Sequence, residues 1–417
     1  MKSETPTIKI ALCGHIDHGK STLIGRLLLD TQSLPDDKIK ELKKISRDLG
    51  EETQIAYFSD QLKEERERDI TIETTQIFLK TRKRPYGLID TPGHLEFIKN
   101  MLTGASHADA ALLLVDITEG IKEQTRRHAY LLNLLSLKNI IVLVNKMDLA
   151  AYDAMKFDRI KNELLNLFTG LGLKPLHIIP VSAKHGENIC RSSRKMVWYR
   201  GPWLSKAMDN LPLTESRTAS GIFRLPIQDI YEINNEKIII GKIAAGTVRE
   251  GQKIFILPQA VSATVKAIKF FGKKKITATA PESIGLTLTS DITVHRGDIL
   301  CAEGDIPRLT QSFKGNIVWL SPASFAKGQT VQLRCATQTF PCAVSQITER
   351  IDPATLAVLE RTASSLKQNE SGIVEFQILG PAVVENYDTV PELGRYTIEN
   401  DIELLGAGTV SQKSDRT

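Results

Sequence analysis

The pattern of apolar and polar positions changes character near residue 215. Before it, short apolar runs alternate with segments in which apolar residues recur every three or four positions, as in an α/β sheet. The apolar runs predict strands at Ile8–Cys13, Gly87–Ile89, Ala111–Val115, Ile140–Val144 and His177–Val181. The periodic segments predict helices at Ser21–Leu29, Glu123–Leu135 and Phe157–Leu167.

After residue 215, short β-rich runs recur with Gly, Pro, Asp or Asn between them, which is typical of small β-barrels. These runs are Ile238–Ile240, Lys253–Leu257, Thr264–Phe271, Ile317–Leu320, Thr330–Cys335 and Gly372–Ile378. About 200 residues suit two barrels, and Pro307 with its polar neighbours indicates the break between them. We therefore expect an α/β domain over residues 1–215 and all-β barrels over 216–308 and 309–417.

Composition excludes several other classes of protein. Apolar residues make up 41% of the chain and charged residues 25%, which is ordinary for a globular protein. No run approaches the ~18 apolar residues of a spanning helix. Five dispersed cysteines without a CxxC motif indicate neither a metal cluster nor disulfides. Ile8–Cys13 is expected to be a first strand that runs into a glycine-rich loop, so we expect no signal peptide. We expect a cytoplasmic protein with no membrane association.

Residues 14–21 read GHIDHGKS between a predicted strand and a predicted helix, which is a complete phosphate-binding loop. Gly14 and Gly19 let the backbone turn its N–H groups toward phosphates. Lys20 can reach the β- and γ-phosphates, and the Ser21 hydroxyl can bind Mg²⁺. The candidate phosphate-site residues are Gly14, His15, Ile16, Asp17, His18, Gly19, Lys20, Ser21 and Thr22.

A second motif, DTPGH at residues 90–94, follows the apolar run Gly87–Ile89. Asp90 at a strand end can hold Mg²⁺ through water. The Gly93 N–H can bond a γ-phosphate and so sense its loss, and His94 can orient an attacking water. The motif therefore predicts hydrolysis of the bound nucleotide.

The base-reading residues are expected in NKMD, residues 145–148, after the strand Ile140–Val144. The Asp148 carboxylate can accept both the N1–H and the 2-amino group of guanine, a pair that adenine lacks. Asn145 would brace the loop, and the Lys146 stem would cover the base. Ser182, Ala183 and Lys184, which follow the next strand, would complete a pocket for GTP or GDP.

Thr71 is the candidate for a second Mg²⁺ side-chain ligand, between the phosphate loop and Asp90. Ile70 and Ile72 flank it, so an ordinary strand threonine is the alternative. The charged stretch from Lys38 to Asp69 predicts a solvated helical insert, of the kind that a γ-phosphate and Mg²⁺ can order.

Taken together, GHIDHGKS, ITI, DTPGH, NKMD and SAK resemble the translation-factor class of GTPases. The resemblance implies an α/β P-loop GTPase domain followed by two all-β barrel domains. It also implies that Lys20 holds phosphates, that Ser21 and Thr71 bind Mg²⁺ with support from Asp90, and that His94 positions the hydrolytic water.

The same resemblance implies that Asn145, Lys146 and Asp148 read guanine. It places a monovalent cation near Asp17, and it makes Ile16 and Ile70 an apolar gate in front of His94. One position departs from the family pattern, because Asp69 stands where the family usually has glycine. The conformation of the segment around Thr71 is thereby left open.

Two subfamilies fit the chain. The runs DTQS, EQTRRH, MVWYRGP, HRGDIL and VWLS resemble the GTPase subunit of bacterial sulfate adenylyltransferase, whose partner is a small adenylyltransferase subunit. The phosphate loop instead resembles elongation factors, because the sulfurylase subunit usually reads GSVDDGKS. The runs WYxGP and LGRYTI also occur in tRNA-carrying factors, so tRNA or the ribosome is the alternative partner.

Charge favours the sulfurylase interpretation. Residues 309–417 hold 9 Lys and Arg against 12 Asp and Glu, whereas 216–308 hold 13 against 9 and 1–215 hold 32 against 28. A tRNA carrier needs a basic track, and a net −3 in the last domain opposes one. The one dense basic run, Lys269 to Lys275, is expected to be a solvated hairpin end. The sequence therefore favours a GTPase subunit of sulfate adenylyltransferase with a protein partner.

Overall fold

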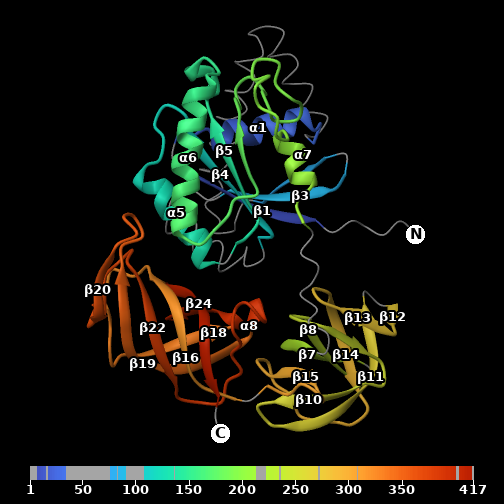
Figure 1. Cartoon of the computed structure of the whole chain (residues 1–417). Helices are drawn as coiled ribbons and strands as arrows, with labels where there is room; N and C mark the ends of the chain where they lie inside the picture. Colours follow the sequence, from blue (N-terminus) through green and yellow to red (C-terminus); the bar gives the residue numbers. More distant parts are fainter. Residues whose placement is uncertain are drawn as a thin grey trace. The chain divides into compact units, whose positions relative to one another are not determined.

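A computed structural model describes residues 7–15, 17–33, 76–81, 83–90, 108–135, 137–212, 222–233, 236–270, 273–307, 309–400 and 403–415. The chain divides into two compact units. One comprises Met1–Leu213 with Pro353–Leu356, and the other comprises Thr214–Asp352 with Ala357–Thr417. The first unit is α/β, and the described residues of the second are all-β apart from one short helix (Figure 1).

A six-stranded sheet in the order β2-β3-β1-β4-β5-β6 forms the centre of the first unit. Its strands are β1 Ile8–Gly14, β2 Gln76–Lys80, β3 Pro85–Asp90, β4 Ala110–Asp116, β5 Ile140–Asn145 and β6 His177–Pro180. All neighbours are parallel except β2 and β3. The carboxyl ends of the five parallel strands therefore share one edge, where ligands of open α/β sheets bind.

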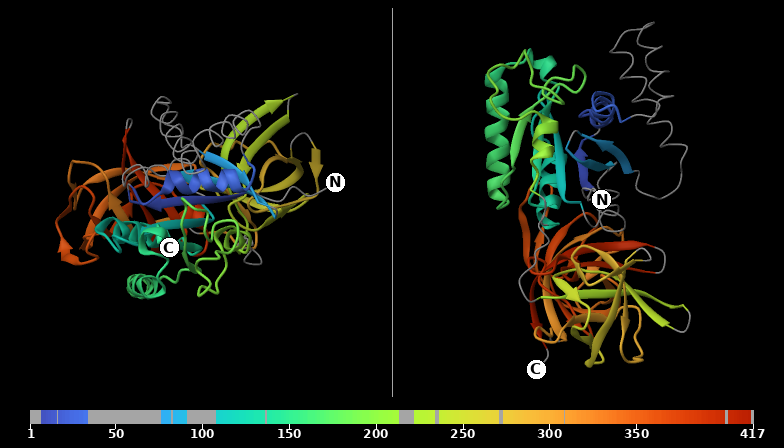
Figure 2. Two further views of the ribbon diagram at one scale, coloured as in Figure 1. Left: turned by 90° about the horizontal axis from the view of Figure 1, so that it is seen from above. Right: turned by 90° about the vertical axis from the view of Figure 1, so that its right-hand side faces the viewer.

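Helices cover both faces of this sheet. They are α1 Lys20–Asp30, α5 Glu123–Leu134, α6 Ala154–Gly170 and the short α7 Leu204–Asp209, with the 3₁₀ turn η1 Met147–Ala150. The apolar sides of α1 and α7 join one buried cluster with the strands, and α5 and α6 lie on the other side of the sheet from α1 (Figures 1 and 2). The predicted strands and helices of this domain are confirmed to within a few residues, whereas β2 and α7 were not predicted.

The first barrel of the second unit is a seven-stranded sheet in the order β10-β15-β7-β8-β14-β11-β12. Pairing of β10 with β11 closes it around an aliphatic core. The strands are β7 Arg224–Ile233, β8 Glu236–Lys242, β10 Lys253–Leu257, β11 Val261–Phe270, β12 Lys273–Lys275, β14 Ser283–Leu288 and β15 Ile299–Ala302; β9 Thr247–Arg249 pairs with β13 Thr277–Thr279.

The second barrel has the strand order β18-β23-β24-β16-β22-β19-β20 and is closed by pairing of β18 with β19. Its strands are β16 Thr310–Trp319, β18 Thr330–Cys335, β19 Gln338–Ile351, β20 Val358–Ala363, β22 Ser371–Ile378, β23 Arg395–Glu399 and β24 Leu404–Asp415; β17 Phe325–Ala326 pairs with β21 Ser365–Leu366, and α8 is Pro391–Gly394. Trp319 is buried and stacks on Phe325 at 4.7 Å between ring centroids. The expected succession of an α/β domain and two β-barrels is confirmed, and the boundaries at 215 and 308 stay predictions.

A buried ionic network joins the two barrels. The Arg224 guanidinium on β7 lies 3.0 Å from the Asp305 carboxylate and 3.2 Å from that of Glu385, which also pairs with Lys413 at 3.0 Å. An apolar cluster beside it contains Leu257 and residues of both barrels. Separating the barrels would leave the buried Arg224 charge without Glu385, which is costly. These contacts therefore hold the two barrels together as one compact unit.

Among the described helices, none has the length and apolar character needed to cross a membrane. The described residues also contain no group of three or more His, Cys, Asp or Glu side chains placed to hold a metal ion. All five cysteines are free thiols.

Candidate nucleotide-binding site

The loop that links β1 to α1 adopts a backbone that glycine makes possible. Gly19 has φ of 91°, and a Cβ built on it would lie 2.5 Å from the Asn145 amide nitrogen. Gly14 has φ of 153°, and its Cβ would meet Leu114 on β4 at 3.0 Å. Asp17, with φ of 66°, adds a third left-handed residue. Such alternation turns backbone N–H groups inward and forms an anion-binding concavity.

The start of α1 adds positive potential at this concavity. Gly19 is its N-cap, and no acidic residue lies in its first turn to neutralise the helix dipole. The Lys20 amine bends over the loop and donates to the carbonyl oxygens of Gly14 at 2.5 Å and His15 at 3.1 Å. Ser21 and Thr22 follow, half-buried, in the first turn. The arrangement suits a polyphosphate.

Asn145, the last residue of β5, connects three loops. Its amide nitrogen donates to the His18 carbonyl at 2.9 Å, and its amide oxygen accepts from the Ala183 N–H at 3.0 Å. Asn145 and Ala183 are both about 2% exposed. The expected bracing role of Asn145 is therefore a direct link between the phosphate loop, the NKMD loop and the SAK loop.

Asp148 lies in η1 and faces the SAK loop. The Ser182 hydroxyl donates to one Asp148 carboxylate oxygen at 2.5 Å, and the His185 imidazole lies 3.9 Å from the other. The carboxylate remains 16% exposed, so its orientation is set while part of it stays open to a ligand. Lys184 is exposed at the end of this loop.

Asp116, the last residue of β4, is a further candidate that the sequence had not indicated. Its carboxylate lies 2.7 Å from the Lys146 amine and accepts from the Thr118 N–H and hydroxyl, each at 2.7 Å. Burial would raise the pKa of Asp116, but the hydrogen bonds from Lys146 and Thr118 outweigh burial and hold the pKa below its ordinary value. Asp116 is thus ionised at neutral pH and directs the Lys146 side chain.

The signal for Asp116 was its position. It ends a buried strand at the edge where Gly14 and Asn145 end theirs, and it is in register with Asn145. In the sequence, Asp116 stands directly after the apolar run Ala111–Val115 and belongs to no recognisable motif. An acid at the carboxyl end of a parallel strand is worth testing as a site residue for this topological reason.

The candidate metal-binding residues are only partly described. Ser21 lies in the first turn of α1, and Asp90 ends β3 in register with Leu12, two residues before Gly14. Hydroxyl and carboxylate oxygens are donors of the type that Mg²⁺ prefers, so the residue types at these two positions suit the ion. Asp17, the candidate for a monovalent cation, is exposed.

Several expected site residues lie outside the described residues. They are Ile16, the charged stretch from Lys38 to Asp69, Ile70, Thr71, Gly93 and His94. Their roles in switching, metal binding and water positioning stay predictions.

The side chain of His18, a residue of the phosphate loop, is fully buried. Its Nδ1 lies 3.1 Å from the Leu114 carbonyl oxygen, and its Nε2 lies 3.5 Å from the Glu119 carboxylate. Burial lowers the pKa of His18 below 6.5, and the Leu114 carbonyl, Glu119 and Asp116 oppose this only in part. The imidazole of His18 is therefore neutral at neutral pH.

This burial predicts a pH dependence of stability. Below a pH of about 6.5 an exposed histidine of the unfolded chain takes up a proton more readily than buried His18, so acid favours unfolding. We expect His18→Asn, which can keep a donor toward Leu114, to lose less unfolding free energy than the unmodified chain between pH 7.5 and 5.5. Urea titrations at both pH values measure this, and equal losses would contradict it. His177, whose pKa burial also lowers, is common to both proteins.

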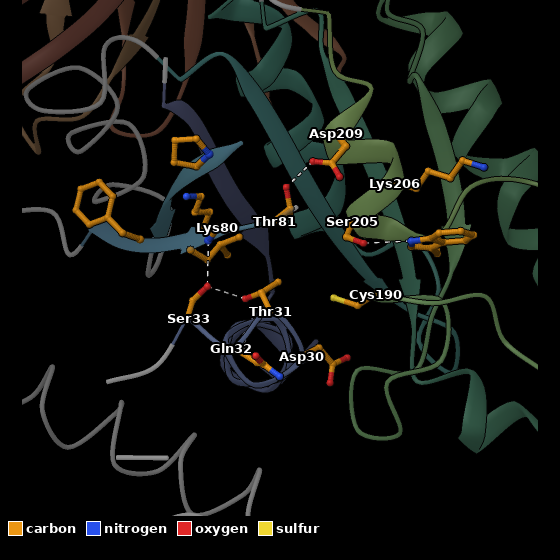
Figure 3. Close-up of a pocket in the computed structure, with 14 residues that line it drawn as sticks. Asp30, Thr31, Gln32, Ser33, Lys80, Thr81, Cys190, Ser205, Lys206 and Asp209 are labelled. Atoms are coloured by element: carbon orange, nitrogen blue, oxygen red, sulfur yellow. Dashed lines mark hydrogen bonds between the residues drawn. The ribbon is translucent and has the colours of Figure 1, made fainter. Parts of the chain in front are cut away.

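A cavity of about 1050 Å³ lies apart from these loops (Figure 3). Around it, the Asp209 carboxylate accepts from Thr81 and Tyr86 at 2.6 and 2.8 Å, and Cys190 points in from the far side. None of the candidate nucleotide-site residues lines it. Ser33 lines this cavity, and the residues that follow it, 34–75, lie outside the described part of the chain. The cavity is therefore assigned no ligand.

Two family models match the chain. The model of the elongation factor Tu GTP-binding domain matches residues 5–224, and that of the GTP-eEF1A C-terminal domain-like family matches residues 312–411. The first covers more than half of the chain and contains every motif of the candidate nucleotide site. The chain therefore belongs to the translation-factor class of GTPases, and GTP or GDP is its expected ligand.

Individual relatives are similar over nearly the whole length. Elongation factor 1-alpha of Pyrococcus horikoshii is 36% identical over 98% of both chains, and that of Archaeoglobus fulgidus is 36% identical over 100% of both. A solved structure of Sup35 with GDP is 21% identical over 99% of this chain and 96% of that one, with a TM-score of 0.46, which adds nothing to the assignment. These relatives give the sulfurylase interpretation no support and favour the alternative.

Proposed function

We propose that this protein is a GTP-hydrolysing switch of translation elongation that acts with tRNA and the ribosome. The observation that carries the proposal is the joining of the phosphate loop, NKMD and SAK through Asn145, in a chain 36% identical over its length to elongation factor 1-alpha. The two closed barrels after the GTPase domain agree with that similarity.

Different described residues bind the phosphates and the base of the nucleotide. Lys20 and the backbone from Gly14 to Gly19 hold phosphates, and Asp148, oriented by Ser182, accepts the guanine N1–H and 2-amino group. The Lys146 stem covers the base while its amine stays on Asp116. Mg²⁺ would be held by Ser21 and Thr71 with support from Asp90, and it would neutralise phosphate charge.

The switch itself is proposed from the family resemblance. Thr71 and the Gly93 N–H would respond to the γ-phosphate, and His94 would orient the hydrolytic water. After hydrolysis the segments around Thr71 and Gly93 would lose their contacts with the γ-phosphate, and this would change the surface that binds the partners.

The test is nucleotide-dependent binding of aminoacyl-tRNA. The protein loaded with a non-hydrolysable GTP analogue is expected to retain aminoacyl-tRNA on a filter and to protect its ester bond from hydrolysis, whereas the GDP form is not. Ribosomes should then accelerate GTP hydrolysis. Deacylated tRNA is the control ligand. Equal affinity of the GTP-analogue and GDP forms for aminoacyl-tRNA, with no acceleration by ribosomes, would rule the proposal out.

A further inference from the structure

A stretch of the first unit between β6 and α7 is strongly basic and has no part in the nucleotide site. No acidic residue occurs between Glu187 and Asp209, whereas five cations do. All five are exposed, namely Arg191, Arg194, Lys195, Arg200 and Lys206, and the Lys206 amine lies over the Trp203 ring at 5.0 Å. We call residues Cys190–Pro202 the arginine loop.

The three arginines of this loop have no ion-pair partner among the described residues. Within the part of the chain that the structure describes, Arg191, Arg194 and Arg200 make no ion pair or side-chain hydrogen bond. Other guanidinium groups of the described residues pair with carboxylates, among them those of Arg26, Arg127, Arg224, Arg334 and Arg350. An arginine triad with neither partner nor nearby acid in sequence is available to a ligand that supplies negative charge.

The backbone that presents these arginines is fixed by its own polar groups. The Asn188 amide oxygen accepts from the Ser193 N–H at 2.8 Å, and the Ser193 hydroxyl accepts from the N–H groups of Lys195 and Met196 at 3.0 and 3.1 Å. Met196 is 1% exposed. The loop is irregular but anchored, so little backbone ordering has to accompany binding.

Aromatic residues hold the far end of the loop against the protein. The Trp198 indole N–H donates to the Tyr152 carbonyl at 3.0 Å, and its ring lies 5.4 Å from Phe157. Lys195 is already engaged, since its amine lies 3.3 Å from the Tyr152 hydroxyl. The free cationic groups are therefore the three guanidinium groups.

We propose that the arginine loop is a docking surface for the phosphate backbone of RNA. Guanidinium groups match phosphate with two parallel hydrogen bonds, and an RNA strand offers one phosphate per nucleotide. Within the loop, Val197 is the one exposed large aliphatic side chain, too little apolar surface for the core of a protein interface. The choice of RNA as the ligand rests on the proposed function, whereas the anionic character of the ligand follows from the loop itself.

The test compares two triple variants of the full chain in the GDP form, so that neither hydrolysis nor a γ-phosphate enters the result. R191Q/R194Q/R200Q removes the free guanidinium groups. K327Q/R361Q/K367Q removes three exposed cations of the second barrel that also lack ion pairs within the described residues. The probes are a deacylated tRNA transcript and an oligouridine, titrated at several salt concentrations with polyglutamate as competitor.

The arginine-loop variant is expected to bind both RNAs about tenfold or more weakly at low salt, and the slope of log K against log salt should fall by about two to three. The control variant should keep the slope of the unmodified chain. Unchanged RNA affinity and slope in the arginine-loop variant would overturn the inference. So would a loop-dependent affinity for polyglutamate exceeding that for RNA, because it would assign the surface to an acidic protein. The preference of the GTP-analogue form over the GDP form for aminoacyl-tRNA is measured separately, and its absence would contradict the proposed function without affecting this inference.

Discussion

Asp148→Asn is expected to change the base preference of the site from guanine to xanthine. The carboxylate can accept two donors of guanine, whereas an amide offers one acceptor and one donor, which suits the N1–H and 2-oxo group of xanthine. Ser182 can still donate to the amide oxygen, so the side chain keeps its orientation. With guanine, the amide keeps one hydrogen bond without the charge and places a donor against the second guanine donor, which together cost about 3 kcal/mol or more, or about a hundredfold in GDP affinity.

The measurement is competition of GDP, XDP and ADP against a fluorescent GDP analogue. Asp153→Asn is the matched control, since Asp153 caps α6 through Met155 and Lys156 N–H groups and an asparagine can do the same. It should leave guanine preference intact. A variant of Asp148 that still prefers GDP over XDP would remove this residue from base reading.

Asn145→Ala is expected to weaken nucleotide binding and the fold together. It leaves the buried Ala183 N–H and His18 carbonyl without the partner seen here, at about 1–3 kcal/mol for each group. We expect about 2–4 kcal/mol less unfolding free energy and a GDP affinity reduced about a hundredfold, because the phosphate and base loops lose their common support.

Asn139→Ala is the control at the opposite end of the same strand, where the amide makes one hydrogen bond, to the Asp109 carbonyl at 3.0 Å. Urea unfolding and GDP titration of both variants separate the two ends of β5. If Asn145→Ala binds GDP as tightly as Asn139→Ala, the three loops do not depend on this amide.

The parallel strands could be predicted because both of their faces are buried. Such strands are continuous apolar runs, as in β4 and β5, where every residue is buried. The chemistry then follows from position, since the loops after these strands must meet at one edge. This is why the order of four short motifs was enough to predict a nucleotide site.

Barrel strands were harder to predict. Five of the six residues of β20 are exposed, so it has no apolar period to detect, and β19 is 14 residues long with several register shifts. The helix α7 has six residues, too few for a helical period. Contacts such as Asn145 with His18, 127 residues apart, depend on the assembled sheet.

The comparisons do not support the subfamily that the charge count favoured. A net charge of −3 over residues 309–417 was taken to oppose RNA binding, but a domain total adds charges that lie on different surfaces. Lys413, Arg334 and Arg350 of this domain are paired with carboxylates, whereas three arginines without an ion pair within the described residues lie close together in the arginine loop of the first unit. The phosphate loop, which favoured elongation factors, was the better guide.

The central claim is that this chain binds guanine nucleotides at the edge formed by Gly14, Asn145, Asp148 and Ser182. Equilibrium competition of GTP, GDP and ATP against a fluorescent GDP analogue on the unmodified protein tests it most directly. We predict that GTP and GDP displace the analogue while ATP requires a concentration about a hundredfold higher or more, as expected for two charge-assisted hydrogen bonds to the base. Equal affinities for GTP and ATP would contradict the account.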